Sequence, residues 1–238
     1  MRRFYTSFKN FRDQNVTLSL EETRHLRDVL RLREGAEIHV FDGFGREYLC
    51  AVEKIAKRET NLKIINEVQP FAPESILDLT LAVALLKGEK FDLAIQKAVE
   101  LGVKKFVPLN TIRADVKIKD GEKKLERWRK IIIDATKQCG RAALMEIDAP
   151  IDFEKFISSA KGTKVLFAEK DGERFSDIKS AENITALIGS EGGWENTEIE
   201  IAREKGFQII TFGGRILRAE TAVISITAVL QHRFGDFI

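Results

Sequence analysis

The chain has 238 residues, of which 44% are hydrophobic and 32% are charged, and its formal net charge is +2. This length and composition predict a globular protein with one large domain or two unequal ones. No run approaches eighteen consecutive apolar residues, and the start lacks the apolar core of a secretory signal, so we expect a cytoplasmic protein without a membrane span. Cys50 and Cys139 lie far apart and the three histidines form no zinc motif, so neither a disulfide nor a metal site is expected.

The first seventy residues predict a small β domain that contains one helix. Ser19-Leu-Glu-Glu22 fits a capping box. Leu26, Val29 and Leu30 then repeat at helical spacing until Gly35, which predicts a core-facing stripe on a helix that ends at this glycine.

Basic residues occupy the opposite side of this predicted helix. Arg24, Arg27 and Arg31 are spaced by three and four, which places their guanidinium groups on one face, where they suit phosphate oxygens. His25 lies beside them and is a candidate for stacking on a base. The alternative is a plain solvated face, but a second basic segment at residues 104–141 favours an anionic partner.

Two further signals organise this part of the chain. Asp42-Gly-Phe-Gly45 lies between strand-like segments and predicts a hairpin. The stretch "VQPFAPES" holds two of the four prolines and predicts a domain boundary near residues 69–75.

From Ile76 onward the pattern alternates between buried strands and helices, which predicts an α/β domain with a mainly parallel sheet covered by helices. The expected strands cover residues 76–87, 103–109, 164–170, 184–190 and 207–213. The expected helices cover residues 91–102, 122–141 and 219–234.

Two glycine-rich loops leave the last two of these strands, "LIGSEGGWENTEIE" and "TFGGRILRAETA". Ligands of open α/β sheets bind at the carboxyl ends of strands, and glycines let a ligand approach the backbone closely. The alternative is that they are ordinary turn glycines. Neither loop fits the common nucleotide-binding patterns, and Ser190 is remote in sequence from every histidine, so a serine triad is disfavoured.

These loops belong to five segments that together resemble one known family. The segments are "HLRDVLRLREG", "FDLAIQKAVELGVKKFVPL", "DATKQCGR", "IGSEGGWENTEIE" and "FGGRILRAETA". They are similar, in order and over almost the whole chain, to the RsmE family of 16S ribosomal RNA uridine-N3 methyltransferases of the SPOUT superfamily. The chain departs from the family at Ser190, where proline is usual, and at Ile112 and Ala114, where an acid and a serine are usual, which weakens any role for Arg113.

The resemblance implies a fold and a set of partners. Residues 1–70 are expected to form a PUA-like β-barrel domain that binds RNA. Residues 74–238 are expected to form a SPOUT α/β domain with a trefoil knot, which binds S-adenosylmethionine (SAM) and releases S-adenosylhomocysteine. The expected substrate is a uridine in 16S ribosomal RNA of the small ribosomal subunit, and the expected assembly is a homodimer packed through the knotted region.

The resemblance also implies a cofactor site made mainly of backbone groups from three neighbouring segments. Its expected residues are Leu187, Ile188, Gly189, Glu191, Gly192, Gly193, Phe212, Gly213, Gly214, Ile216, Leu217, Ala219, Thr221 and Ala222.

Arg218 and Glu220 are then expected where the target base enters. Methylation at N3 removes an imide proton, so an arginine that stabilises charge on O2 and O4 suits the reaction, and Glu220 is a candidate proton acceptor or orienting partner. The alternative is that Arg218 pairs with an acid to fasten the loop. Lys87 and Arg141 are expected RNA contacts. A SPOUT enzyme for another nucleotide and a non-catalytic RNA-binding factor remain alternative functions.

Overall fold

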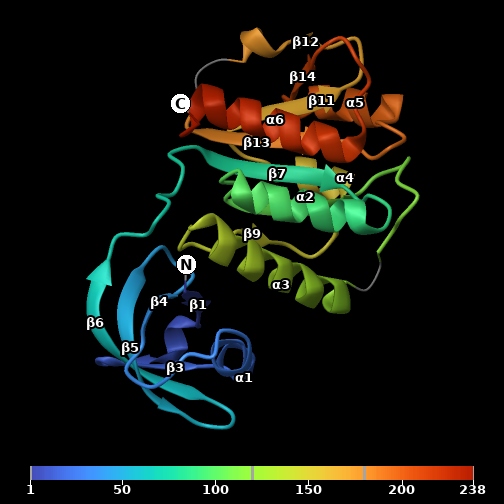
Figure 1. The fold of residues 1–238 in the computed structure, drawn as a ribbon. Coiled ribbons are helices and arrows are strands. Elements are labelled where there is room, and N and C mark those ends of the chain that lie inside the picture. Colours follow the sequence, from blue (N-terminus) through green and yellow to red (C-terminus); the bar gives the residue numbers. More distant parts are fainter. Residues whose placement is uncertain (1, 119–120, 179–180, 238) are drawn as a thin grey trace. The chain divides into compact units, whose positions relative to one another are not determined.

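The computed structural model describes residues 2–118, 121–178 and 181–237, and these form two compact units. Unit 1 contains the described residues up to Glu74 together with Thr136–Leu144. Unit 2 contains Ser75–Ala135 and the described residues from Met145 onward. Each unit has its own sheet, and Figure 1 shows the elements of both.

Unit 1 is built on a six-stranded sheet with the order β1-β4-β5-β6-β3-β2. The pair β1 and β4 is parallel, and the other neighbours are antiparallel. The strands are β1 (Arg3–Tyr5), β2 (Phe11–Arg12), β3 (Asn15–Leu18), β4 (Glu37–Phe41), β5 (Glu47–Ile55) and β6 (Thr60–Val68), with a 3-10 turn, η1, at Phe8–Asn10.

The predicted hairpin at residues 42–45 is confirmed, since it joins β4 to β5. The Asp42 carboxylate accepts hydrogen bonds from the backbone N–H groups of Phe44 at 2.7 Å and Arg46 at 3.2 Å, which closes the turn. Alternate residues of the strands point inward, so that Val16 and Leu18 of β3 are both buried in the core of this unit.

The helix of unit 1 begins as predicted. The Ser19 hydroxyl accepts a hydrogen bond from the N–H of Glu22 at 3.3 Å, and α1 (Leu20–Arg24) follows directly. A π-helical turn, His25–Val29, continues it.

The predicted end of this helix at Gly35 is wrong. Arg31 has a φ of 52°, outside the helical range, and Val29, an expected core residue, is 65% exposed. The chain leaves the helix early because Leu32 packs into the same core as Leu26, with the N–H of Leu32 donating to the carbonyl of Leu26 at 3.1 Å. A longer α-helix would carry Leu32 to another face.

A buried arginine attaches the segment Thr136–Leu144 to the sheet of unit 1. The Arg3 side chain is 1% exposed and donates to the Glu47 carboxylate at 2.7 and 3.0 Å. Arg3 also donates to the carbonyls of Thr136 at 3.0 Å and Arg141 at 2.8 Å. These contacts satisfy a charged group that would otherwise be costly to bury.

Unit 2 contains a sheet in which every pair of neighbouring strands is parallel, which confirms the predicted α/β class. The strand order is β10-β8-β7-β13-β11-β14-β12, and β9 pairs with β8. The strands are β7 (Asp78–Ala84), β8 (Lys105–Asn110), β9 (Glu146–Ile147), β10 (Ile151–Asp152), β11 (Thr163–Ala168), β12 (Glu173–Arg174), β13 (Asn183–Ile188) and β14 (Gln208–Thr211).

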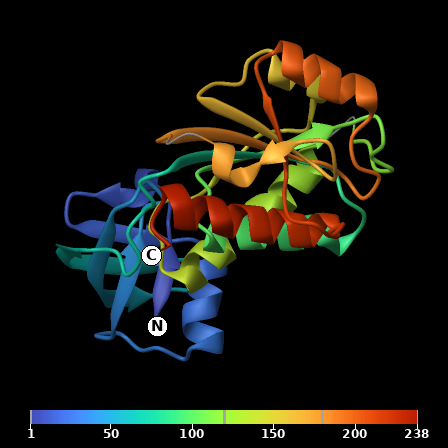
Figure 2. The ribbon, with the colours of Figure 1, turned by 90° about the horizontal axis from the view of Figure 1, so that it is seen from above.

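Helices cover both faces of this sheet (Figure 2). Helices α2 and α6 pack against each other on one face, and α4 and α5 pack against each other on the other. The helices are α2 (Glu89–Glu100), α3 (Glu122–Cys139), α4 (Phe153–Ile157), α5 (Asn196–Glu204) and α6 (Ala219–Phe234), with a 3-10 turn, η3, at Phe175–Asp177. The central strands of this sheet are mostly apolar, with buried runs such as Leu81–Ala84 of β7 and Ala186–Ile188 of β13, as expected for strands covered on both faces. In the described part of the chain no helix is long and apolar enough to cross a membrane.

Helix α2 is specified by the spacing of its apolar residues and by the glycine that follows it. Phe91, Ala94, Ile95 and Ala98 recur at helical spacing and are buried against the sheet and neighbouring helices. Gly102, with a φ of 75°, lets the chain turn back toward β8.

Candidate functional site

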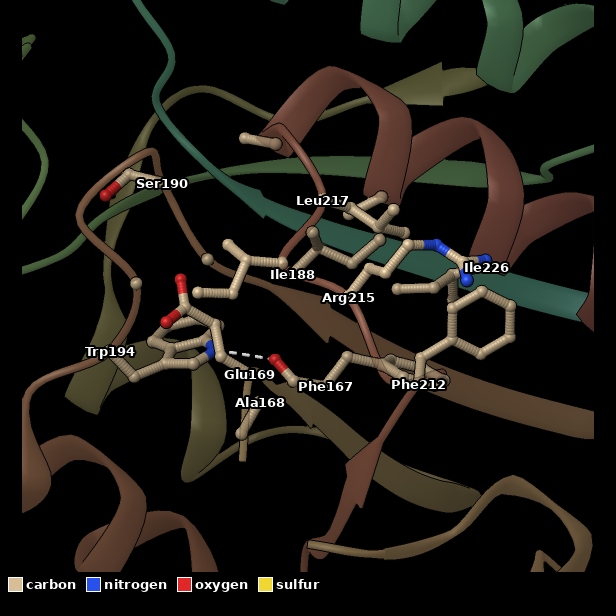
Figure 3. A pocket seen from close by; sticks show the side chains of 15 residues that line it. Phe167, Ala168, Glu169, Ile188, Ser190, Trp194, Phe212, Arg215, Leu217 and Ile226 are labelled. Carbon is tan, nitrogen blue, oxygen red and sulfur yellow. Dashed lines mark hydrogen bonds between the residues drawn. The ribbon is translucent and has the colours of Figure 1, made fainter. Parts of the chain in front are cut away.

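A pocket lies at the carboxyl ends of β13, β11 and β14 (Figure 3). These strands are neighbours in a parallel sheet, so the loops that leave them converge at one edge. The pocket is lined by Phe167, Ala168, Glu169, Ile188, Gly189, Ser190, Gly193, Trp194, Phe212, Arg215, Ile216, Leu217, Ala219, Ala222 and Ile226.

The structure brings the two glycine-rich loops and the start of α6 together, as expected from the sequence. Of the expected cofactor residues, those that line the pocket are Ile188, Gly189, Gly193, Phe212, Ile216, Leu217, Ala219 and Ala222. The others lie on the same segments but do not line it: Leu187, Glu191, Gly192, Gly213, Gly214 and Thr221. Leu187 is fully buried in the core behind the pocket, so its side chain cannot face a ligand.

The end of β11 is a part of the pocket that sequence reasoning missed. Phe167, Ala168 and Glu169 line it because β11 lies between β13 and β14. The sequence shows that residues 164–170 form a strand, but strand order depends on long-range pairing. An acid at the end of a buried strand was the one local signal, and Glu169 supplies it.

The glycine-rich loop after β13 is held in place by close contacts. Trp194 donates from its indole Nε1 to the carbonyl of Phe167 at 2.9 Å, the dashed bond in Figure 3. Gly193 has a φ of 67°, which disfavours any side chain there. A Cβ at this glycine would lie 3.5 Å from the Glu169 carboxylate, so the acid lies directly against the loop.

Arg113 fastens the same loop from outside the pocket. Its guanidinium pairs with the Glu195 carboxylate and donates to the carbonyl of Gly192 at 3.3 Å. The Glu198 carboxylate accepts from the N–H groups of Ile112 and Glu195, both at 2.9 Å. Arg113 therefore has a role in holding the loop despite the departures from the family pattern around it.

Ser190 is a buried residue of this loop. It is 7% exposed, and its hydroxyl forms no hydrogen bond with any described residue. Its side chain lies at the edge of the group in Figure 3, turned away from Ile188 and Leu217. Nothing in this placement activates the hydroxyl as a nucleophile.

Arg218 and Glu220 lie at the beginning of α6, and their side chains have different surroundings. Arg218 is the N-cap residue; it is exposed, lies outside the pocket lining and forms no ion pair or hydrogen bond within the described chain. The Glu220 side chain is 15% exposed, and its Oε2 lies 3.7 Å from Nζ of Lys90. The alternative of an Arg218–Glu220 pair that fastens the loop is therefore not observed.

Lys90 also contacts the glycine-rich loop. Its Nζ donates to Oε1 of Glu191 at 3.1 Å, and the N–H of Lys87 approaches the same oxygen at 3.4 Å. Partial burial raises the pKa of Glu191, but hydrogen bonds from its own amide, Lys90 and Lys87 outweigh it, so the pKa lies below its usual value.

The expected RNA contacts of unit 1 do not share one helix face. Arg24 and Arg31 are exposed, but Arg31 lies beyond the helix, which corrects the predicted stripe. Arg27 is paired with Asp28 at 2.7 Å. His25 is partly buried, with its ring edge-on to a core phenylalanine at 5.9 Å, so only part of it is open to a ligand.

Arg141 is not an exposed RNA contact, contrary to expectation. It is 5% exposed, and its guanidinium donates to the Glu74 carboxylate at 2.7 Å. This pair lies inside unit 1 and holds the segment Thr136–Leu144 in place.

Lys87, in contrast, is exposed in the loop that follows β7, where its Nζ pairs with Asp115 at 2.8 Å. No group of three or more metal-ligating side chains occurs among the residues that the structure describes.

Comparison with known proteins identifies the family. A family described as "RNA methyltransferase domain" matches residues 73–231, and one described as "RNA methyltransferase PUA domain" matches residues 19–65. The chain is 33% identical over 213 residues to the "Ribosomal RNA small subunit methyltransferase E" of Aquifex aeolicus, covering 89% of this chain and 91% of that protein. It is 34% identical over 231 residues to the Synechocystis protein of the same name, covering 92% and 75%.

The fold agrees with these matches. The crystal structure of ribosomal RNA small subunit methyltransferase E from Neisseria gonorrhoeae, bound to S-adenosyl methionine, superposes with a TM-score of 0.92. It is 33% identical to this chain, and the match covers 100% of both chains. On these grounds the chain belongs to the ribosomal RNA small subunit methyltransferase E family.

Proposed function

We propose that the protein transfers a methyl group from SAM to N3 of a uridine in the 16S ribosomal RNA of the small subunit. Family membership and the likeness to a SAM-bound enzyme support this. The observation that carries it is the convergence of three strand-end loops on one pocket beside Arg218 and Glu220.

The residues present fit SAM. Phe212, Leu217 and Ile226 offer apolar surface for an adenine ring, and the Glu169 carboxylate suits hydroxyl or ammonium donors. Gly193 lets a ligand approach the backbone without meeting a side chain. When bound, SAM supplies an activated methyl group on a positively charged sulfur. Ile216, 78% exposed at the rim, is available to cover an adenine from outside.

The first residues of α6 suit the chemistry at N3. The imide proton leaves as the methyl group arrives, and negative charge spreads to O2 and O4 of the base. Arg218, which has no partner among the described residues, can donate to these oxygens. Glu220 can receive the proton or orient the base. The main work of the protein is then to align the base with the methyl group and to stabilise this charge.

Unit 1 supports binding of the RNA around the target. N3 lies on the Watson–Crick edge, so the uridine must be unpaired or splayed out. Arg24, Arg27, Arg31 and part of His25 offer donors for the RNA backbone at the surface of a unit that contains the PUA match. We therefore also propose that the enzyme acts in the cytoplasm.

Two further proposals concern organisation. We propose that residues 1–70 bind RNA and that residues 74–238 form a trefoil-knotted catalytic domain, whose segment Thr136–Leu144 packs in unit 1. In support of the knot, β14 pairs with β11 on the side opposite β13, so the chain crosses β11 between β13 and β14. We also propose a homodimer packed through α6. Ile224, Ala228 and Val229 form an apolar surface on α6 that is only partly buried within the chain.

Identification of the modified nucleoside tests the function. The protein is incubated with labelled SAM and small ribosomal subunits that lack the modification, and the RNA is digested and analysed. The expected product is N3-methyluridine. Label on a carbon, on a ribose oxygen or on another base would favour a related enzyme with a different target, and RNA binding without any label would favour a non-catalytic factor.

A further inference from the structure

We propose that Lys90 is a positioning residue for methyl transfer, which joins the glycine-rich cofactor loop to the first turn of α6 by holding the carboxylates of Glu191 and Glu220. This inference rests on the proposed function.

The geometry brings three separate segments to one ammonium group. Lys90 lies in the first turn of α2, after the loop that leaves β7, while Glu191 follows β13 and Glu220 begins α6. Nζ of Lys90 lies 3.1 Å from Oε1 of Glu191 and 3.7 Å from Oε2 of Glu220. Glu191 lies between Gly189, which lines the pocket, and Gly192. Its ion pair with Lys90 therefore connects α2 to the cofactor loop directly.

The two carboxylates are satisfied to different degrees. Oε1 of Glu191 accepts from Nζ of Lys90 and from the N–H of Lys87. Oε2 of Glu220 is buried and has no hydrogen-bond partner among the described residues, so its contact with Lys90 is electrostatic only. Glu191 is therefore fixed, whereas Glu220 keeps a free acceptor atom beside a positive charge.

The Lys90 ammonium group attracts both carboxylates and opposes the repulsion between them. Other charged groups in this region are Lys87, which is paired with Asp115, and Arg218, two residues before Glu220. Lys90 thereby holds the Glu220 carboxylate in place at the first turn of α6.

The imide proton passes from uridine N3 to the Glu220 carboxylate, and the N3 electron pair forms the new bond to the methyl carbon. The electron pair of the broken carbon–sulfur bond stays on the sulfur of the product, S-adenosylhomocysteine. Lys90 takes no part in the transfer and acts through Glu220 and Glu191.

The test compares Lys90→Gln with Lys90→Arg, which keeps the charge. The control is Lys97→Gln on the same helix, which removes an ion pair of 2.8 Å with Glu100. The measurements are kcat on the RNA substrate and the affinity for SAM by calorimetry. We expect Lys90→Gln to lower kcat by about tenfold or more, since Glu220 is no longer held in place.

The affinity of Lys90→Gln for SAM should fall several-fold because the cofactor loop is loosened. Lys90→Arg should recover most of each property, and Lys97→Gln should match the wild type. The proposal is overturned if Lys90→Gln behaves like Lys97→Gln, or if Lys90→Arg recovers neither kcat nor the affinity for SAM. A wild-type protein that binds SAM but methylates no N3 would instead refute the proposed function, and the calorimetric comparison would still decide whether Lys90 supports the cofactor loop.

Discussion

Two groups of charged residues, one in each unit, differ in whether they have hydrogen-bond partners within the protein. In unit 1, Arg3 is almost fully buried, and its guanidinium donates to Glu47 and to three backbone carbonyls. In unit 2, Arg218 is exposed without a partner among the described residues, and Glu220 has a buried oxygen that lacks a hydrogen bond there. The hydrogen bonds of the first group are satisfied within the protein, and those of the second group are not.

The difference separates charges that stabilise the fold from charges suited to a ligand. A buried guanidinium is tolerated only when its donors are satisfied, so the interactions of Arg3 with the last turn of α3 make that segment part of unit 1. Unsatisfied groups beside a pocket lower stability slightly, and a substrate with complementary groups restores the missing interactions. Four variants test this distinction.

The largest effect should come from Arg3→Ala. It leaves the buried Glu47 carboxylate with only His39 beside it, so the free energy of unfolding of unit 1 should fall by about 3 kcal/mol or more. Native-state hydrogen exchange of the β4 and β5 amides measures this, while fluorescence of Trp128 and Trp194 reports unit 2 separately. Arg46→Ala removes an exposed pair of similar length, with Glu67 at 2.6 Å, and should destabilise far less. Equal effects would contradict the distinction.

Arg218→Ala should leave the fold intact and impair catalysis. Loss of one donor to a developing negative charge typically costs about 100-fold to 1000-fold in kcat. Affinity for SAM should stay within several-fold, because Arg218 does not line the pocket. Single-turnover methylation and calorimetry separate the two quantities. A variant with normal kcat and weak RNA binding would make Arg218 an RNA contact instead.

Gly193→Ala should weaken the cofactor site. A left-handed backbone costs an alanine about 1–2 kcal/mol, and the loop can relieve this strain only by changing its backbone conformation. We expect affinity for SAM to fall about tenfold, in line with that energy. Gly206, with a φ of 80° and open space around it, lies at the other end of β14 and is the matched control. Gly206→Ala should lower stability without changing affinity; the same loss of affinity in both variants would point to global destabilisation.

The smallest effect is expected from Arg27→Ala combined with Arg31→Ala. Removing two phosphate contacts should weaken RNA binding and reduce the slope of log affinity against log salt by about 1 to 2. Lys54→Ala with Lys63→Ala removes two exposed charges from the strands of the same unit and serves as the control. If both double variants change the slope equally, the RNA interaction depends on overall charge and not on this surface.

Much of unit 2 could be predicted from sequence because its signals are local. The apolar run around Leu79 to Val83 and the glycines after Ile188 and Phe212 mark strands and loops by neighbouring residues alone. The position of β11 between β13 and β14, and hence the role of Glu169, could not be predicted, since it depends on pairing between distant segments.

The predictions for two arginines were not met, for a similar reason. Arg31 and Arg141 belong to basic stretches, yet one leaves the helix so that Leu32 can reach the core, and the other is buried against Glu74. In both cases packing outweighs a local pattern. The contact between Lys90 and Glu220 joins residues 130 positions apart in the numbering, and no local pattern points to it.

A crystal structure of the protein with S-adenosylhomocysteine tests the central claim most directly. We predict that the adenine lies against Leu217 and Ile226 at the ends of β11, β13 and β14, with the sulfur facing the side of Arg218 and Glu220. Electron density for the ligand elsewhere, such as the separate cavity lined by Thr111, Phe153 and Ile201, would contradict the account.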